Sequence, residues 1–566
     1  SHGPDDFNLC LNNGIKAIET VDGDGKYTKN VKLFEGVHIF KSNPIVIQKL
    51  KEQKKLLSSG ELVHSYPHSW RSKAPLVHRA TPQWFISMDS HKLRNKALKA
   101  IDETTFYPSK GKERLKSMIE TRPDWCVSRQ RVWGVPLPIF INKKTNKILV
   151  DDNVFENIAK IYEKEGSDCW FSDDPQKFLG KKYKAEDFEK LSDIVEVWFD
   201  SGSTHSFVLE KRKDLKWPAS MYLEGSDQHR GWFHSSLLES CGTRDRAPFE
   251  SILSHGFVVD GKGLKMSKSL GNVIAPEDIL KKYGADILRI WVASSNYAED
   301  LRIDYSILDQ HAESYRKIRN TFRYLLGNLN DSFVDENLEK IDIKKLPELE
   351  KLMLHKIYNL DTNFNKYFKN YDFHNLYKEL LNFCTVDLSS FYFDIRKDTL
   401  YCDPKDSEKR KSTLLLLNII LNSLLKWFAP ILSFTTEEIY QLVSKKKKSI
   451  HLEKFLNFPK KFENLELNDK WNHLLKIRDI CNLSIEEKRA NKVIGSSLEA
   501  SLKIKVNKND LKYLKEIDLA ELCITSSVEI IEADTKEIIV ETIKAEGEKC
   551  PVCWKISKDP CRRHND

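Results

Sequence analysis

The chain contains the stretch LKMSKSLGN at residues 264–272, and this stretch decides how the rest of the sequence is interpreted. An apolar run ending at Val259 precedes it and Pro276 follows it, which predicts a strand, a mobile basic loop and the start of a helix. The ammonium groups of Lys265 and Lys268, three residues apart, can close over a triphosphate as flexible point charges. The loop is therefore a candidate for stabilising a leaving pyrophosphate, and a merely solvated loop is the alternative.

Length and composition predict a large multidomain protein. The 566 residues are 40% apolar, enough for about three to five domains, and no stretch approaches the roughly 18 to 20 apolar residues of a membrane span. The 11 cysteines are scattered, which favours a reducing compartment, and we expect a cytoplasmic protein without a membrane partner. The net charge of +8 permits a polyanionic partner without requiring one. The first residue is not Met and falls inside a motif, so we expect a fragment.

The first residues resemble the end of a small α/β domain. The sequence HGPDDF at residues 2–7 predicts a turn and a helix start, and the alternating segment at 37–40 predicts a strand. An acidic pair at a helix N-terminus is favoured by the helix dipole, so Asp6 has a purely structural explanation on local grounds.

Aromatic and basic residues are dense in the loops that follow. The segments at 66–72, 79–85 and 122–131 combine Pro, Trp and Arg, which can contact phosphates and bases or stack inside a loop core. Residues 142–190 are highly charged, and we expect a loop-rich insertion there.

Glu224 and Gln228 lie in the segment MYLEGSDQHRGWF at 221–233. It follows the segment 194–203, which predicts a buried strand opening into a Ser/Gly turn, and it precedes a helix. Ligands of doubly wound folds bind beyond the carboxyl ends of strands, where a carboxylate can accept hydrogen bonds from ribose hydroxyls or an ammonium. For Asp227 we expect an N-cap role.

The sequence becomes helical beyond about residue 305. It predicts one helix at 414–428, closed by Pro430, and another from Glu437 with a capping box of Thr435 and Glu438. Residues 502–506 and 537–540 predict strands of a small α/β module. For the lysines at 445–448 a solvated helix end is favoured over an RNA contact.

The last residues hold a predicted metal site. Cys550 and Cys553 form one short pair, Cys561 and His564 form a second, and two such pairs across a turn are typical of tetrahedral zinc. We therefore expect one Zn²⁺ at the C-terminus. His564 is the least certain ligand by position because it lies close to the end of the chain.

The motif KMSKS at 265–269 resembles the signature of class I aminoacyl-tRNA synthetases. The segments 66–72, 79–85, 129–136 and 285–297 are similar to the isoleucyl enzymes, and RQRVWGVP at 129–136 favours them over the valyl and leucyl enzymes. Some relatives place zinc-binding Cys where this chain has Ser69 and Ser72; hydroxyls are poor zinc ligands, so no metal is expected there. The family usually has Cys at the place of His564.

The resemblance implies an α/β multidomain protein made of the second half of a Rossmann-like class I synthetase catalytic domain, an editing-domain remnant, an α-helical anticodon-binding bundle and a small C-terminal zinc module. The expected parts are the editing remnant at 1–64, the catalytic half at 65–305, a helical connector at 306–345, the anticodon-binding bundle at 346–500, an α/β junction at 501–546 and the zinc module at 547–566.

The resemblance also implies a reaction. The family condenses isoleucine with ATP and Mg²⁺, passes it from the adenylate to tRNA(Ile), and hydrolyses mischarged Val-tRNA(Ile). Lys265 and Lys268 would stabilise the pyrophosphate, Glu224 would contact the adenylate and Gln228 its ribose. Asp6 would hold the α-amino group of a misattached amino acid. Arg562 and Arg563 would suit tRNA contact, and a monomer is expected.

Two alternatives remain open at this point. One is a valyl- or leucyl-tRNA synthetase, and the other is a non-catalytic tRNA-binding protein on the same scaffold. The family's HIGH motif and threonine-rich editing region would precede residue 1, so the fragment alone is expected to be inactive. An intact HIGH motif upstream would distinguish an enzyme from a binding module.

Overall fold

A computed structural model describes residues 4–69, 72–329, 337–444, 448–514, 517–535, 537–561 and 563–564. The chain divides into two compact units. Unit 1 comprises the described residues up to 105, with 112–222 and 227–251; unit 2 comprises 106–111, 223–226 and the described residues from 252 onward. Within these described ranges, no helix combines the length and apolar character needed to cross a membrane.

The first part of unit 1 has helices α1 (Pro4–Asn12) and α2 (Ser42–Glu52). The strand expected at 37–40 is wrong: His38 forms only an isolated bridge with Lys26, and a 3-10 turn follows at Ile39–Lys41. The Nδ1 atom of His38 accepts a hydrogen bond from the N–H of Phe40 at 3.3 Å, which favours the turn over an extended backbone.

The centre of unit 1 packs helices against short strands. Antiparallel pairs join β1 to β3 and β4 to β7, while α9 packs against both α3 and α8. The bounds are β1 (Phe85–Ile86), β3 (Trp125–Cys126), β4 (Ser128–Arg129), β7 (Ile194–Val195), α3 (Leu93–Glu103), α4 (Lys110–Glu120), α8 (Val197–Gly202) and α9 (Trp232–Arg244).

Helix α8 replaces most of the strand and turn expected at 194–203. The strand ends at Val195, and the carbonyl of Glu196 accepts the N–H of Phe199 at 2.9 Å, which starts a helical turn. Gly202 allows α8 to approach α9 closely, because a Cβ there would lie 2.2 Å from Oε1 of Glu239. The pattern of apolar residues alone did not distinguish a buried helix from a buried strand.

The insertion at 142–190 is a folded subdomain, not the loop-rich segment expected. Strands β5 (Phe140–Asn142) and β6 (Phe188–Lys190) pair antiparallel beside α5 (Asp152–Glu165), α6 (Cys169–Ser172) and α7 (Pro175–Leu179). Their side chains form a separate core that includes the fully buried Trp170 and Phe178. The many charged residues of this segment hid the core from the sequence analysis. The inward face of α5, with the buried residues Val154 and Ile158, is the apolar part of an otherwise polar helix.

Unit 2 begins with short strands and two helices around residues 264–272. The strand order β2-β9-β8 forms one sheet, and β10 pairs in parallel with β11. The bounds are β2 (Thr105–Tyr107), β8 (Tyr222–Gly225), β9 (Ser251–His255), β10 (Val258–Asp260), α10 (Pro276–Tyr283), α11 (Ala285–Ser294) and β11 (Leu301–Ile303). The expected strand, loop and helix beginning at Pro276 are confirmed, but Gly284 at φ +85° ends α10 and separates it from α11.

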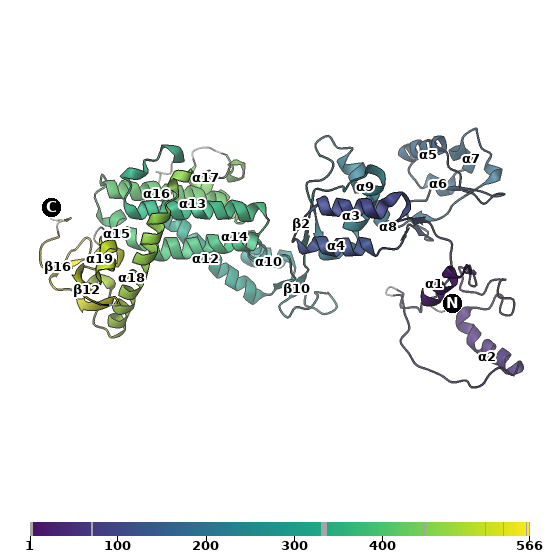
Figure 1. Cartoon of the computed structure of the whole chain (residues 1–566), viewed down its shortest axis with the longest axis horizontal. Helices are drawn as coiled ribbons and strands as arrows, with labels where there is room; N and C mark the ends of the chain where they lie inside the picture. Colours follow the sequence, from purple (N-terminus) through teal and green to yellow (C-terminus); the bar gives the residue numbers. More distant parts are fainter. Residues whose placement is uncertain are drawn as a thin grey trace. The chain divides into compact units, whose positions relative to one another are not determined.

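A helical bundle forms most of unit 2, and Figure 1 shows α12, α13 and α16 running side by side. It comprises α12 (Tyr305–Leu329), α13 (Glu348–Lys369), α14 (Phe373–Asn382), a π-helix (Phe383–Phe393), α15 (Asp394–Cys402), α16 (Glu408–Phe428), α17 (Ser433–Val443) and α18 (Leu465–Ala490). The helix expected at 414–428 is confirmed and starts earlier, at Glu408. The reason is that Ser407 caps it by accepting the N–H of Arg410 at 3.1 Å.

The capping box expected for α17 is wrong. The helix begins at Ser433, and the carboxylate of Asp286 in α11 accepts the backbone N–H groups of Phe434 at 3.2 Å and Thr435 at 2.7 Å. A cap supplied by another helix leaves no local sequence pattern. Of the lysine run at 445–448, residues 445–447 lie outside the described residues.

A buried ion pair joins three helices of the bundle region. The guanidinium of Arg396 donates two hydrogen bonds of 2.7 Å to the carboxylate of Glu350, whose side chain is fully buried. The same guanidinium donates to Glu521 at 2.8 Å, and the hydroxyl of Tyr392 donates to Glu350 at 3.0 Å. The network connects α13 and α15 to α20 (Leu519–Leu522).

The C-terminal part contains a small sheet and a hairpin. Strand β12 (Ala500–Val506) pairs in parallel with β13 (Ser527–Glu532) and antiparallel with β14 (Ile539–Lys544), next to α19 (Lys508–Leu514). The strands expected at 502–506 and 537–540 are thus present, the second beginning at Ile539. The hairpin pairs β15 (Glu548–Lys549) with β16 (Ile556–Ser557).

Candidate functional site

The basic loop of unit 2 is held at both ends by Asp260, the last residue of β10. Its carboxylate accepts the N–H of Lys262 at 3.0 Å, the N–H of Leu264 at 2.8 Å and the side-chain amide of Asn272 at 2.9 Å. The hydrogen bond from Asn272, followed by that from Leu264, holds the pKa of Asp260 below its usual value. Asp260 is therefore ionised at neutral pH and closes the loop.

Asn272 and Met266 order the residues between the two lysines. The Asn272 amide oxygen accepts the N–H of Ser267 at 2.9 Å, and its nitrogen donates to the carbonyl of Lys265 at 3.3 Å. The partly buried side chain of Met266 packs against the apolar cluster that contains Ile279. The loop thus has a defined backbone, although the sequence pattern predicted only mobility.

The side chains of Lys265 and Lys268 are exposed on this loop. In the part of the chain that the structure describes, neither ammonium group has a carboxylate within ion-pair distance. Because no internal anion neutralises them, both charges are available to an external phosphate group. The loop is chemically suited to hold the leaving group of a nucleotide reaction.

Gln228 caps α9, the role that we expected for Asp227. Its Oε1 accepts the N–H of Trp232 at 3.0 Å, while its Nε2 donates to the carboxylate of Asp227 at 3.1 Å. A Cβ at Gly231 would lie 2.4 Å from Oε1 of Gln228 and 2.7 Å from the ring of Trp198. Gln228 is therefore fixed in orientation beside Trp198, which sequence reasoning had not singled out.

Two further predicted residues lie in exposed positions. Glu224 is exposed on β8 in unit 2. Asp6 is exposed in the first turn of α1, and residues 1–3 of its motif lie outside the described residues. These positions allow ligand contact and do not by themselves distinguish it from a structural role.

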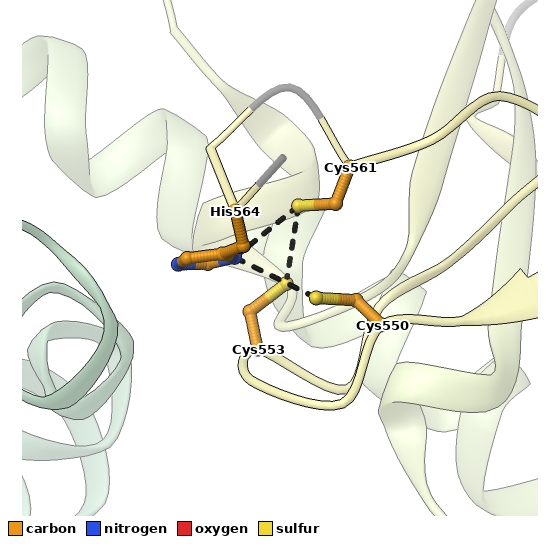
Figure 2. Close-up of side chains that lie close together, drawn as sticks. All are labelled: Cys550, Cys553, Cys561 and His564. Carbon is orange, nitrogen blue, oxygen red and sulfur yellow. Dashed lines mark hydrogen bonds between the residues drawn. The ribbon is translucent and has the colours of Figure 1, made fainter. Parts of the chain in front are cut away.

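The four predicted metal ligands converge at the C-terminus, as Figure 2 shows. The ligand atoms of Cys550, Cys553, Cys561 and His564 all lie within 4.8 Å of one another. Cys553 Sγ is 3.8 Å from Cys561 Sγ, and His564 Nδ1 is 3.6 Å from Cys550 Sγ and 3.3 Å from Cys561 Sγ. Sulfur atoms bound at ~2.3 Å in a tetrahedral zinc site are roughly 3.8 Å apart, so the donor set fits zinc.

The hairpin shapes the first half of this cluster. The N–H of Cys550 donates to the carbonyl of Lys555 at 2.9 Å, and the N–H of Trp554 donates back to the carbonyl of Cys550 at 3.0 Å, with Trp554 at φ +64°. The backbone N–H of Cys553 is the main group that lowers the pKa of Cys550 to about 6. A thiolate is the form that binds a metal.

The ring orientation of His564 suits a ligand. Its Nε2 lies 2.9 Å from the carbonyl of Cys402, which can only accept, so Nε2 carries a proton. This hydrogen bond is also the main reason that the pKa of His564 is raised. The other nitrogen, Nδ1, faces the thiols, and a bound metal would displace any proton there.

Arg563 does not lie free for tRNA. Its guanidinium donates to the carboxylate of Asp398 at 2.7 Å and also to that of Asp403. Arg562 lies outside the described residues. The structure shows for Arg563 an internal ion pair that the sequence did not reveal.

Comparison with known proteins identifies the class. Residues 14–304 match the family described as tRNA synthetases class I (I, L, M and V), and residues 350–505 match the anticodon-binding domain of tRNA ligase. The chain therefore belongs to the class I tRNA synthetase family, with part of a catalytic domain and an anticodon-binding helical domain.

Similar curated proteins include several isoleucine-tRNA ligases. The chain is 78% identical over all of its 566 residues to the enzyme of Pelagibacter ubique, of which it covers 62%. It is 44% identical to the enzymes of Zymomonas mobilis and Caldicellulosiruptor saccharolyticus, over 98% of this chain and 60% and 61% of those proteins. The chain thus spans about three fifths of the length of these relatives.

Proposed function

We propose that the protein containing this chain is an isoleucine-tRNA ligase, which activates isoleucine with ATP and Mg²⁺ and transfers it from the adenylate to tRNA(Ile). The observation that carries this proposal is the 78% identity over the whole chain to a curated isoleucine-tRNA ligase. It favours the isoleucyl enzyme over the valyl and leucyl enzymes and over a non-catalytic binding protein. The eleven free cysteines support a cytoplasmic location, and the monomeric state is proposed from the resemblance alone.

The proposed roles of the residues rest on the resemblance to the family and are compatible with where the residues lie. Lys265 and Lys268 interact with the β- and γ-phosphates, while Asp260 and Asn272 keep the loop closed around them. Bound Mg²⁺ supplies further charge neutralisation. Glu224 accepts hydrogen bonds from the adenylate, and Gln228, oriented by its cap on α9, contacts the ribose. Catalysis in this scheme is positioning plus electrostatic stabilisation.

We place the domain limits as expected from the sequence. The matched ranges support a catalytic part and an anticodon-binding part. Residues 1–64 then belong to an editing domain, and 547–566 form a zinc module whose ligands are Cys550, Cys553, Cys561 and His564.

In the complete protein, Lys268→Ala should slow isoleucine-dependent ATP-pyrophosphate exchange by at least about tenfold, or roughly 1.4 kcal/mol of activation free energy. The reason is that the ammonium stabilises charge that develops on the leaving pyrophosphate. Lys262→Ala is the matched control, since Lys262 is exposed in the same loop and its hydrogen bond to Asp260 comes from its backbone N–H, which the change keeps. If Lys268→Ala exchanged pyrophosphate at the same rate as Lys262→Ala, the proposed role of Lys268 would be contradicted.

Asp6→Ala in the complete protein should let Val-tRNA(Ile) accumulate while isoleucine activation is retained. One methylene separates valine from isoleucine, and a binding pocket discriminates so small a difference weakly, which makes hydrolysis necessary. Asp5→Ala is the control, because Asp5 lies in the same helical turn. The measurement is the deacylation rate of Val-tRNA(Ile). If both variants clear it at the parental rate, Asp6 is only a structural acid.

A further inference from the structure

The end of α15 contacts the segment that carries two of the four candidate zinc ligands. The carbonyl of Cys402, the last residue of α15, accepts a hydrogen bond of 2.9 Å from His564 Nε2. Arg563, between Cys561 and His564, pairs with Asp398 inside α15 and with Asp403 just after it. The metal centre therefore has neighbours that are far from it in sequence.

The Cys402 carbonyl is a favourable partner for an imidazole N–H. It belongs to the last turn of α15, where carbonyls have no partner within the helix and carry the negative end of the helix dipole. A hydrogen bond from one ring nitrogen of a ligating histidine fixes the tautomer and makes the other nitrogen a better donor to the metal. Here that other nitrogen is Nδ1 of His564, which faces the thiols of Cys550 and Cys561.

Arg563 fixes the backbone between Cys561 and His564, the two ligands of this segment. Its guanidinium spans two carboxylates, and the side chains of Asp398 and Asp403 are only 26% and 14% exposed. Asp403 is itself held in place, since Arg410 donates to its carbonyl at 2.7 Å. Two carboxylates of fixed position on either side of one guanidinium define its orientation, so they also define where Cys561 and His564 lie.

The other half of the cluster is attached elsewhere. The hairpin with Cys550 and Cys553 is joined to the small sheet region by the N–H of Ile556, which donates to Ser526 Oγ at 2.7 Å. A cavity of about 220 Å³, lined partly by Tyr401, Ile524 and Trp554, lies between the hairpin and α15. Apolar packing is incomplete at this junction, so the polar contacts of Arg563 and His564 hold the C-terminal segment against α15. A zinc ion bound by all four ligands would join that segment to the hairpin.

From these contacts we infer that Asp398, Asp403 and the Cys402 carbonyl are positioning residues of the C-terminal metal centre, so that the end of α15 sets the affinity for zinc and zinc holds the tail against α15. The inference rests on the zinc module proposed above. It goes beyond the ligand set by making the helical domain part of the metal site.

The test is the zinc affinity of the complete protein, measured by competition with a chromogenic chelator. Asp398→Asn with Asp403→Asn should weaken zinc binding by about 10- to 100-fold. The control is Asp394→Asn with Asp406→Asn, which removes the same charge from the same region without touching Arg563; Asp394 pairs with Lys397. The thiolate-to-metal absorption of the Co²⁺-loaded double variant should be unchanged, because the four ligands remain.

The outcomes separate the two proposals. A parent protein that binds no zinc removes the metal site itself. A parent that binds zinc, with equal affinity in Asp398→Asn/Asp403→Asn and in its control, overturns the positioning role alone. If circular dichroism shows that the double variant does not fold, Arg563→Gln replaces it, since Arg563 is an exposed residue. The same weakening is expected, and parental affinity in Arg563→Gln overturns the inference.

Discussion

Replacing Cys553 with serine is expected to remove the zinc ion from the C-terminal site. The parent protein should contain about one zinc per chain, because three thiols and an imidazole lie at tetrahedral spacing. Zinc contributes of the order of 10–16 kcal/mol to the folding of small structural modules, which a hairpin of this size cannot replace by apolar burial. The tail should therefore lose its fold, and tRNA charging should fall while ATP-pyrophosphate exchange is retained.

The test of the site is the zinc content per chain, measured by elemental analysis of Cys553→Ser, His564→Ala and the control Cys10→Ser. Cys10 is a free thiol in α1, so its variant should keep the parental zinc content. Full zinc content in His564→Ala would show that His564 is not the fourth ligand. Loss of pyrophosphate exchange in Cys553→Ser would contradict the separation between the zinc module and the activation reaction.

Glu350→Ala is expected to destabilise unit 2 by about 3–5 kcal/mol. The change leaves the guanidinium of Arg396, whose side chain is 3% exposed, without the carboxylate that accepts two of its hydrogen bonds. Tyr392 and Thr413 lose the same acceptor, at 3.0 and 3.3 Å. Glu521 still accepts one hydrogen bond from Arg396 at 2.8 Å, but two other buried N–H groups of the guanidinium lose their acceptor, and the interior solvates them poorly.

The measurement is the free energy of unfolding in urea, followed by circular dichroism. Glu313→Ala is the control: Glu313 pairs with Arg316 on the surface of α12, both side chains being more than half exposed, and a surface pair contributes about 0–1 kcal/mol. Equal effects of Glu350→Ala and Glu313→Ala would mean that water reaches Arg396 and replaces the lost carboxylate.

Features that depend on neighbouring residues were predictable. The strand, loop and helix around 264–272 follow from an apolar run, glycines and Pro276, and the structure has all three. The convergence of Cys550, Cys553, Cys561 and His564 was also predictable, since both pairs lie within a few residues of each other. In each case the information is local, and short-range backbone preferences are enough to express it.

Features that depend on distant partners were not predictable. Thr435 looks like a cap, but Asp286, far away in the sequence, provides the acceptor for the start of α17. Arg563 looks like a surface cation, but two carboxylates near the end of α15 neutralise it. The sequence contained only a weak indication that Asp260 and Asn272 close the basic loop: an acidic residue at the end of a strand and an amide residue after a glycine. Their hydrogen bond becomes apparent only in the folded structure.

The connection between α11 and the start of α17 has a mechanical consequence. Asp286 accepts three hydrogen bonds from Phe434 and Thr435, and Arg289, one turn along α11, donates to the carbonyls of Pro430 and Ile431 at 2.6 and 3.0 Å. A rotation of α17 must carry α11 with it or break this whole set together. Only Gly284 separates α11 from α10, and α10 begins a few residues after the basic loop, so we expect a displacement of α17 to move the helix that follows Lys268.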